Sequence, residues 1–412
     1  MEPVPDLMKP EVQACPYALY DRLRREAPVY RMPATGFHLV TSYALCEEVI
    51  RQPDLFASEV SPAKLRPGGV PAEVLRVYAE EGWMPRMSCS TSDPPRHTEV
   101  RALLARLFTV AKVREMTPWM EETAGRLIDG FADRGECEFV GAFAHPLPMM
   151  VIAQQLGVPT GMIETFKRWS DAIVEPFSMM ISEEREVECA RLVVEMQQFF
   201  MDKVEDRRAQ PKDDLLTTIA TARGEDGEYL ADEDTLTIIA VDLLASGNET
   251  TTAAIASGMQ MLARDADLAR ALVAEPDRIA NFAEEVLRLE SPAQGMFRRV
   301  TRPTELGGVA LKTGDLLSLR FGAANRDGDE FPHADRIDLD RKSPGRHLAF
   351  GIGRHHCIGA PLARQELVVS FSVLLRRLAE FSLACAEEEL RYTPSFFGRN
   401  LEELPIRFGT RG

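Results

Sequence analysis

The sequence predicts a mainly α-helical protein with small β-sheets, organised as a single domain over residues 1–412. Long stretches such as residues 112–205 repeat apolar residues at helical spacing and are interrupted by glycine and proline. Short apolar stretches bounded by turns predict a few strands, near residues 29–41 and 305–320. No Gly/Ser-rich linker, charge block or internal repeat divides the chain, so one large helical domain accounts for its length.

The N-terminal part is expected to alternate helices with short strands. An amphipathic helix is predicted over residues 16–25, followed by strands over 29–30 and 37–41 and by a helix over 43–51. Residues 61–87 are rich in proline, glycine and methionine, and we expect them to form a loop.

The C-terminal half is expected to contain three longer helices. The acids Asp232-Glu233-Asp234 favour the start of a helix that runs to about Leu262, because they complement its dipole. A second helix ends at Ser291-Pro292. A third begins near Ile358, since Pro361 suits a first helical turn.

The composition excludes several classes of function. A net charge of −16 disfavours binding to nucleic acid. The seven cysteines are odd in number and scattered, which indicates a reducing compartment rather than a disulfide framework. The N-terminus has no signal-peptide pattern, and the most apolar helix is interrupted by Asp242 and Glu249. We therefore expect a soluble cytoplasmic protein that binds neither nucleic acid nor a membrane.

Cys357 lies in a loop that suits a metal ligand. Gly351 and Gly353 allow the backbone to fold tightly around it, and the helix expected near Ile358 places its sulfur at a helix N-terminus. Backbone N–H groups and the helix dipole stabilise a thiolate there. A thiolate without a second cysteine nearby suits a haem iron better than zinc.

Two other interpretations of this loop exist. A lone cysteine in an intracellular protein is often a small buried hydrophobic residue. Alternatively, His355, His356 and Cys357 could bind zinc, although three adjacent residues cannot easily converge on one metal ion.

The centre of the 232–262 helix departs from helical preference, with Ser246-Gly247-Asn248-Glu249-Thr250-Thr251-Thr252 inside an apolar run. Sequences violate local preference where function requires it. An acid beside an alcohol can deliver protons. The alternative is a helix kink with a capped threonine, and the serine hydroxyl could bond back to its own helix.

Together these motifs resemble those of cytochromes P450. The pattern F-G-x-G-x-H-x-C-x-G around Cys357, followed by A-P-L-A-R, is similar to the haem-ligand loop of the bacterial branch. Residues 246–250 resemble the family's A-G-x-[DE]-T motif, with Ser246 where alanine is usual. The motif implies that Gly247 leaves room for oxygen, that Glu249 relays protons from outside and that Thr250 holds a water. Ser246 could reach oxygen or substrate. The resemblance covers nearly the whole chain and implies the P450 fold, a single haem-thiolate domain and haem b (iron protoporphyrin IX) as cofactor.

The resemblance also implies roles for individual residues. Glu285 and Arg288 form the family's E-x-x-R pair, which a further arginine completes, either Arg336 or, as the alternative, Arg341. Arg299 would replace Arg298 at a haem propionate if the register slipped by one residue. The implied cofactor-binding residues are His97, Arg101, Gly247, Arg298, Phe350, His355, Cys357 and Gly359, of which Cys357 is the iron ligand.

The implied activity is monooxygenation. Such an enzyme hydroxylates, dealkylates or epoxidises a small to medium apolar substrate with O2, and Glu249 and Thr250 would be its catalytic pair. The alternatives are a peroxide-driven or nitric-oxide-reducing relative and a thiolate-haem sensor. The retained acid and threonine favour the oxygen-activating enzyme, because peroxide-using relatives can dispense with this relay.

The expected substrate pocket is apolar and adaptable, because methionine follows irregular shapes. Met179 and Met180 fall in the family's mobile segment and would add to it. Arg86 could instead anchor a substrate carboxylate. The expected lining is Met84, Met87, Val241, Leu244, Ser246, Ala293, Met296, Phe396 and Phe397.

Electrons must come from another protein, because the chain has no flavin or iron–sulfur motif. Basic residues near Cys357 in an otherwise acidic chain would attract an acidic donor such as a ferredoxin, with its reductase. The expected docking residues are Arg106, Arg346, Arg354, His356 and Arg364.

Overall fold

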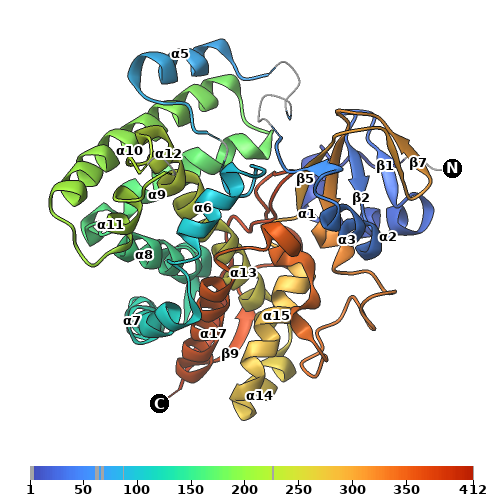
Figure 1. Ribbon diagram of the computed structural model, residues 1–412. Helices are drawn as coiled ribbons and strands as arrows, with labels where there is room; N and C mark the ends of the chain where they lie inside the picture. Colours follow the sequence, from blue (N-terminus) through green and yellow to red (C-terminus); the bar gives the residue numbers. More distant parts are fainter. Residues whose placement is uncertain (1–3, 61–64, 66–68, 87, 225–226, 412) are drawn as a thin grey trace. The chain divides into compact units, whose positions relative to one another are not determined.

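The computed structural model describes residues 4–60, 65, 69–86, 88–224 and 227–411 (Figure 1). It confirms a mainly α-helical fold with small β-sheets. The chain divides into two compact units, each built from separate segments. Unit 1 comprises residues 1–56, 110–148 and 249–412, and unit 2 comprises residues 57–109 and 149–248.

The strands form small sheets. The five-stranded sheet has the order β1-β2-β8-β5-β3, in which β2 and β8 are parallel and both β1–β2 and β5–β8 are antiparallel. A second sheet has the order β4-β10-β9, and β6 pairs with β7. The bounds are β1 Val29–Arg31, β2 His38–Val40, β3 Phe56–Ala57, β4 Glu136–Glu138, β5 Gly295–Val300, β6 Thr304–Leu306, β7 Val309–Leu311, β8 Leu316–Arg320, β9 Leu378–Leu383 and β10 Pro405–Thr410.

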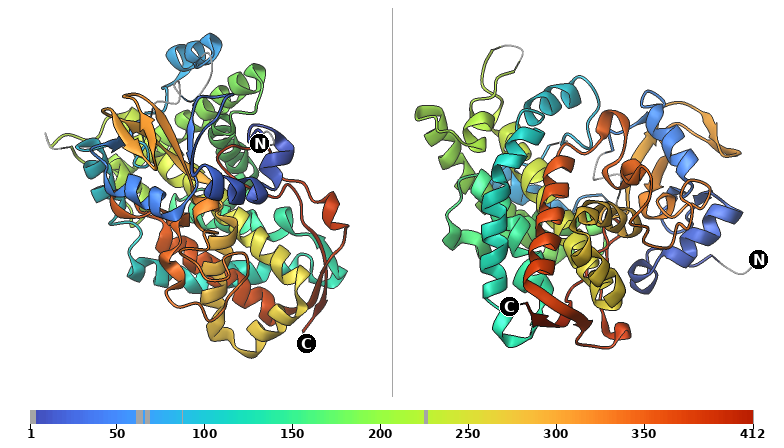
Figure 2. Two further views of the ribbon diagram at one scale, coloured as in Figure 1. Left: turned by 90° about the vertical axis from the view of Figure 1, so that its right-hand side faces the viewer. Right: turned by 90° about the horizontal axis from the view of Figure 1, so that it is seen from below.

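The longer helices of unit 1 surround an apolar interior. Those with residues in this unit are α1 Pro10–Ala14, α2 Tyr17–Glu26, α3 Tyr43–Arg51, α7 Val110–Asp129, α13 Ser246–Arg264 (from Glu249 on), α14 Ala266–Ala274, α15 Ile279–Glu290, α16 Phe321–Ala324 and α17 Ala360–Arg377. Helices α7 and α17 lie side by side (Figure 2), and α15 also packs against α17. The short 3-10 helices are η1 Ala132–Arg134, η6 Pro276–Arg278, η7 Pro344–Arg346, η8 Leu348–Phe350, η9 Gly353–His355 and η10 Glu387–Glu389, and η2 Val140–Ala144 is π-helical.

The approach of α13 to α17 depends on a glycine. A Cβ placed on Gly258 would lie 2.2 Å from Cζ of Phe371, whose ring is completely buried. The ring of Phe282 on α15 also packs against the Phe371 ring, at a centroid distance of 4.9 Å. Glycine is therefore required for α13 to pack at this depth.

Unit 2 is helical. The long helix α10 packs against α5, α9 and α11 (Figure 1), and the hydroxyl of Ser182 caps its first turn by accepting from Arg185 N–H. The elements are α5 Ala72–Glu81, α6 Arg96–Leu104, α8 Pro146–Gln155 (from Met149 on), η3 Thr160–Met162, α9 Ile163–Val174, η4 Glu175–Ser178, α10 Glu183–Ala209, α11 Leu215–Ala220, α12 Asp232–Thr237 and the π-helical η5 Ile238–Ala245.

One sequence prediction needs correction, and two helix predictions are confirmed. The expected loop over residues 61–87 contains helix α5, where Val74 and Val77 pack against α10. The proline and glycine that suggested a loop stand at the two ends of this helix, as Pro71 and Gly82. The helix expected near Ile358 begins at Ala360. The predicted 232–262 helix is present as α12, η5 and α13 in succession.

Candidate functional site

The backbone around Cys357 folds as a tight turn in unit 1. Gly351 and Gly353 both have positive φ, +61° and +67°, which residues with a Cβ rarely adopt. The Cys357 N–H donates to the carbonyl oxygen of Phe350 at 2.8 Å. Cys357 is exposed, and a Cβ on Gly359 would lie 3.9 Å from its Sγ. The loop thus presents an accessible sulfur with no side chain against it from position 359, which fits a single thiolate ligand for haem iron.

Both flanks of this loop are held by one carboxylate, that of Glu284 on α15. His347 Nε2 lies 2.9 Å from Glu284 Oε2, and Arg364 Nε donates to Oε1 at 2.5 Å. Burial alone would raise the pKa of Glu284, but the bonds from His347 and Arg364 outweigh it and lower the pKa to about 2. The residues before and after Cys357 are therefore fixed to α15.

The neighbouring Glu285 forms the expected buried clamp, with one correction. Arg288 donates to both Glu285 oxygens, at 2.8 and 2.9 Å, and Arg341 Nε donates to Oε1 at 2.8 Å. The third member is Arg341, and the choice of Arg336 was wrong. Arg336 has an exposed side chain and contributes only its backbone carbonyl, which accepts from Arg288 at 2.9 Å. Loop 332–341 turns its last arginine inward, which residue spacing alone does not reveal.

The acid of the acid–alcohol pair is held from the C-terminal segment. Asn400 Nδ2 donates to Glu249 Oε1 at 3.3 Å, and both Glu249 and Thr250 are partly buried on α13. A carboxylate oriented by an amide donor, with some access to solvent, can pass protons.

A second carboxylate bonds to Thr251, the residue that follows Thr250 on this helix. Glu366 of α17 is buried and hydrogen-bonded to Thr251. Burial raises the pKa of Glu366 to about 8, and the bond to Thr251 only partly offsets this rise. At neutral pH the Glu366 carboxyl therefore carries a proton.

The helix just before this pair belongs to unit 2. A Cβ on Gly247 would lie 3.0 Å from Cδ1 of Ile152, so glycine allows α8 to pack closely here. The hydroxyl of Ser246 donates to the carbonyl of Val241 at 2.7 Å, although the residue is exposed. Of the alternatives for Ser246, bonding back to its own helix is the one observed.

Asp242, also in unit 2, is a partly buried acid on η5. Its Oδ1 accepts from the backbone N–H of Cys89 at 3.0 Å. Burial raises the pKa of the Asp242 carboxyl to about 7, against the lowering effects of that N–H and of Arg96. Among the described residues none offers a hydrogen bond to its Oδ2, which is closed to solvent.

The residues expected at the haem propionates lie on three elements, of which η9 of unit 1 carries His355 at its end. His97, which is buried, and Arg101 lie four residues apart on α6 of unit 2. Arg298 is buried on β5 of unit 1, where its guanidinium donates to the Phe297 carbonyl at 2.7 Å, and Arg299 is only partly buried. Arg298 and Arg299 point to opposite faces of the strand, so only one of them can fill a given role.

Two of the expected pocket residues are corrected. Phe396 is 1% exposed, stacks on Phe297 at a centroid distance of 5.8 Å and contacts Phe37, so it belongs to the core of unit 1. Leu244 is completely buried in unit 2. Neither side chain leaves surface for a ligand, because an apolar position in a sequence does not distinguish a pocket wall from a core.

The other expected pocket residues differ in exposure. Met87 lies outside the described residues, and Met84 is exposed. Met296 packs against the core beside the five-stranded sheet. The positions that keep partial exposure are Val241, Ala293, Met296, Phe397, Met179 and Met180.

Arg86, the hypothetical carboxylate anchor, is paired with acids of the chain. Its guanidinium forms ion pairs with Glu233 and, at 3.2 Å, with Asp234, both on α12. These pairs disfavour a substrate carboxylate at Arg86, which stays a prediction.

The basic residues expected at a docking surface are in part neutralised. Arg346 pairs with Glu330 at 2.8 Å, and Arg364 pairs with Glu284. Arg354 is exposed in unit 1, and the ring of His356 lies 6.4 Å from that of Phe350. Arg106 is exposed in unit 2.

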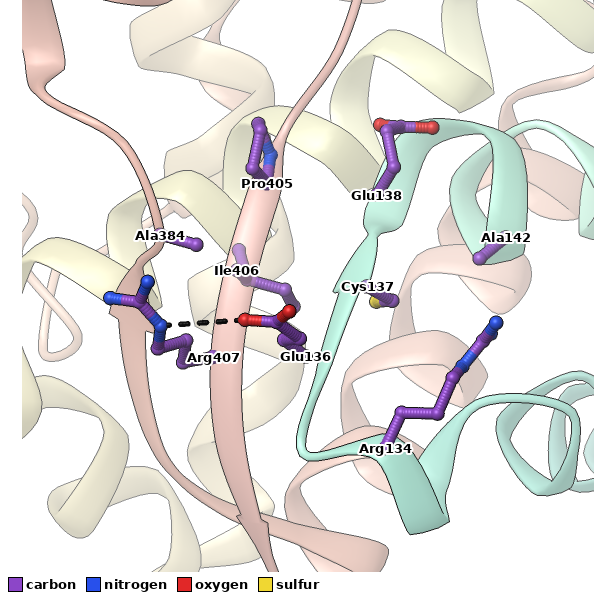
Figure 3. Close-up of a pocket in the computed structure, with 9 residues that line it drawn as sticks. All are labelled: Arg134, Glu136, Cys137, Glu138, Ala142, Ala384, Pro405, Ile406 and Arg407. Atoms are coloured by element: carbon purple, nitrogen blue, oxygen red, sulfur yellow. Dashed lines mark ion pairs between the residues drawn. The ribbon is translucent and has the colours of Figure 1, made fainter.

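A surface hollow of unit 1 is lined by residues of β4 and β10. It measures about 740 Å³, and its wall carries the Arg407–Glu136 ion pair at 3.5 Å (Figure 3). None of its lining residues is a candidate for catalysis or cofactor binding. Over the described ranges, no three His, Cys, Asp or Glu side chains come together as a metal site. Nor does any helix in those ranges combine the length and apolar character that a membrane crossing requires.

Four residues of these arrangements were missed in the sequence. Glu284, Asn400 and Glu366 lie outside the motifs that drew attention and are recognised only by their partners in space. Asp242 did carry a signal, as a charge inside the most apolar stretch.

Known proteins are similar to this chain in sequence and in fold. The cytochrome P450 family model matches residues 143–395. The chain is 34% identical over 413 residues to cytochrome P450 109 of Bacillus spizizenii, covering 98% of this chain and 95% of the relative. It is 34% identical over 419 residues to 6-deoxyerythronolide B hydroxylase of Saccharopolyspora erythraea, covering 99% of each. The structure of CYP109Q5 from Chondromyces apiculatus matches with a TM-score of 0.85 at 34% identity, over 99% of this chain and 98% of that one.

Proteins of this family bind protoporphyrin IX haem through a cysteine thiolate, in agreement with the exposed sulfur of the Cys357 loop. The chain belongs to the bacterial class of the cytochrome P450 family and is a haem-dependent monooxygenase.

Proposed function

We propose that this P450 is a cytoplasmic, single-domain monooxygenase that inserts one oxygen atom from O2 into an organic substrate, with electrons supplied by a ferredoxin and its reductase. The observation that carries the proposal is the Cys357 loop, in which two left-handed glycines and the Cys357-to-Phe350 hydrogen bond hold an accessible sulfur. Its fixed flanks suit a permanent ligand better than a transient one.

The relatives support the reaction class but no single substrate. Their names include a 6-deoxyerythronolide B hydroxylase, a mycinamicin IV hydroxylase/epoxidase and a steroid C26-monooxygenase. Oxygen insertion into an organic compound is common to these names, and we propose an apolar body for the substrate of this chain from its partly exposed methionine, alanine and phenylalanine positions.

We assign the cofactor contacts as follows. Cys357 would hold the haem iron through its thiolate, and His97, Arg101, Arg298 and His355 would pair with the propionates, because each can carry positive charge. Haem, when bound, supplies the electron-transfer chemistry that activates dioxygen. Gly359 would lie beside this ligand, where a Cβ would make an ordinary contact with the sulfur at 3.9 Å.

The residues of α13 would handle protons. Glu249, oriented by Asn400, would accept protons from solvent at its carboxylate and pass them to the hydroxyl of Thr250. Asn400 would act as a positioning residue, because it acts through the carboxylate of Glu249. Glu366 of α17 is hydrogen-bonded to Thr251, the residue after Thr250, and its carboxyl is protonated at neutral pH.

The absorption spectrum of the purified protein tests this proposal. After reduction and addition of carbon monoxide, a strongly red-shifted Soret band is expected, and Cys357→Ala should abolish it. Cys15→Ala is the matched control, since Cys15 is also an exposed cysteine and should leave the band unchanged. An unshifted band in freshly folded protein would rule out the thiolate ligand. Turnover with ferredoxin and reductase, compared with peroxide alone, separates the oxygen-activating enzyme from a peroxide-driven one.

A further inference from the structure

Asp242 has one carboxylate oxygen in use and one without a partner. Oδ1 accepts the Cys89 N–H at 3.0 Å. Oδ2 is closed to solvent, and within the described part of the chain nothing donates to it. A buried carboxylate oxygen without a donor is costly, whereas a matching cation or N–H group removes that cost. Asp242 is therefore poised for a further donor.

The charges around Asp242 favour a cation as that donor. Arg96 is the charged group of this chain that acts on the Asp242 carboxylate. Arg96 is already bonded to Asp234 at 2.8 Å, and Arg86 pairs with both Glu233 and Asp234. These two arginines and two acids balance one another. The Asp242 carboxylate is left as the uncompensated charge of this cluster when it is ionised.

The loop that bonds to Asp242 has no regular structure. Residues 88–92 contain neither helix nor strand, and binding residues are often found beside such loops. On the helical run itself, Ser246 lies four residues further on and is exposed, and Val241 is partly exposed. Glu249 of the proposed proton path follows seven residues after Asp242 along the same run of α12, η5 and α13.

We propose that Asp242 is a specificity-determining residue whose Oδ2 receives the protonated amine of the substrate, so that the enzyme prefers apolar molecules that carry a basic nitrogen. This inference rests on the proposed monooxygenase function, whose substrate class it narrows. The partly exposed Val241 of the same helical run would contact the apolar body of such a molecule, and the carboxylate would fix its cationic end.

A structural role for Asp242 is the competing explanation. In that case its carboxylate would serve only to hold the loop at Cys89. Asp242→Asn separates the two roles. The amide oxygen can still accept the Cys89 N–H, while an uncharged NH2 group replaces the second carboxylate oxygen.

The test is a binding titration with two probes of similar length, N,N-dimethyldodecylamine and dodecan-1-ol. The tertiary amine is protonated at neutral pH, and its two methyl groups hinder coordination to iron. Binding is followed by calorimetry and by the high-spin shift of the ferric Soret band. The matched control is Asp213→Asn, which removes the same charge from an exposed position of the same unit.

The proposal predicts that Asp242→Asn weakens amine binding by about tenfold or more, an effect in the range of a lost charged hydrogen bond. Alcohol binding should change less than about twofold, and Asp213→Asn should bind both probes like the parent. Amine affinity of the parent should also rise with pH between about 6 and about 8, as the carboxyl ionises while the amine stays charged.

The proposal is overturned if Asp242→Asn loses affinity for both probes equally, or if its affinity for the amine equals that of the parent. The monooxygenase function is judged separately, by the carbon monoxide spectrum and by turnover. A normal thiolate spectrum with no preference for the amine rejects the role of Asp242 alone, whereas loss of the thiolate band rejects the proposed function itself.

Discussion

Asn400 donates a hydrogen bond to the carboxylate of Glu249 over 3.3 Å, although the two residues are 151 positions apart in the chain. The amide fixes the direction of an acid that lies where α13 departs from helical preference. Glu249 is thereby held by a segment that the sequence motifs do not include.

Replacing Asn400 by Ala should slow proton delivery without affecting binding. We expect kcat to fall by about threefold to tenfold, well short of the loss on removing a general acid itself, and the solvent isotope effect on turnover to rise. Substrate affinity from the spectral titration should stay constant. Tyr392→Phe is the control, because Tyr392 lies in the same segment but bonds to Gln260. Unchanged turnover and isotope effect in the Asn400 variant would show that Glu249 works without this bond.

The two arginines that the sequence left open should differ sharply in their effect on stability. Arg341→Ala leaves the completely buried Glu285 without one of its partners, so the free energy of unfolding should fall by about 3–5 kcal/mol. Arg336→Ala keeps the backbone carbonyl that accepts from Arg288, so the free energy of unfolding should change by less than about 0.5 kcal/mol. Urea unfolding of the two variants provides the comparison, and similar losses in both would contradict the assignment.

Glu366 should make the protein less stable as pH rises. Burial raises its pKa from the ordinary 4.5 to about 8 in the folded protein. Between these pH values the folded state carries a proton on Glu366 that the unfolded state has lost. Unfolding therefore releases a proton in this window, and the free energy of unfolding falls as pH increases from about 4.5 to about 8. Glu366→Gln, which keeps the hydrogen bond to Thr251, should flatten this slope. Parallel curves for the two proteins would mean that Glu366 ionises normally.

Arg354 should matter to electron transfer. It is exposed beside Cys357, whereas Arg346 and Arg364 already pair with acids. Arg354→Glu should raise the KM for a ferredoxin by about fivefold at low ionic strength and by less in high salt, because the attraction is screened. Arg25→Glu, a charge reversal at another exposed arginine, serves as the control. Equal KM values would place the donor elsewhere.

Much of the fold follows from local pattern, and the exceptions have physical causes. The helix Tyr43–Arg51 was predicted with its observed bounds, because Ser42 caps it and its apolar residues recur at helical spacing. Helix α5 was missed because proline and glycine serve equally well as helix ends and as loop residues.

The site was predictable where chemistry requires a local motif and unpredictable where it depends on pairs distant in the chain. The glycines around Cys357 have the left-handed conformations that their identity suggested. The third member of the Glu285 cluster depends on how loop 332–341 turns, so Arg336 and Arg341 could not be separated. Phe396 was misassigned because burial in a core and exposure to a ligand select the same residue type.

The attachment of both flanks of the Cys357 loop to Glu284 has a consequence for assembly. His347 and Arg364 hold the two flanks of the loop through groups of the chain itself, so part of its order comes from the chain. Capture of haem by the apoprotein then loses less conformational entropy at the ligand loop, and less of the binding free energy is spent on shaping it. The order of events in maturation would be fixed loop flanks first and the prosthetic group second.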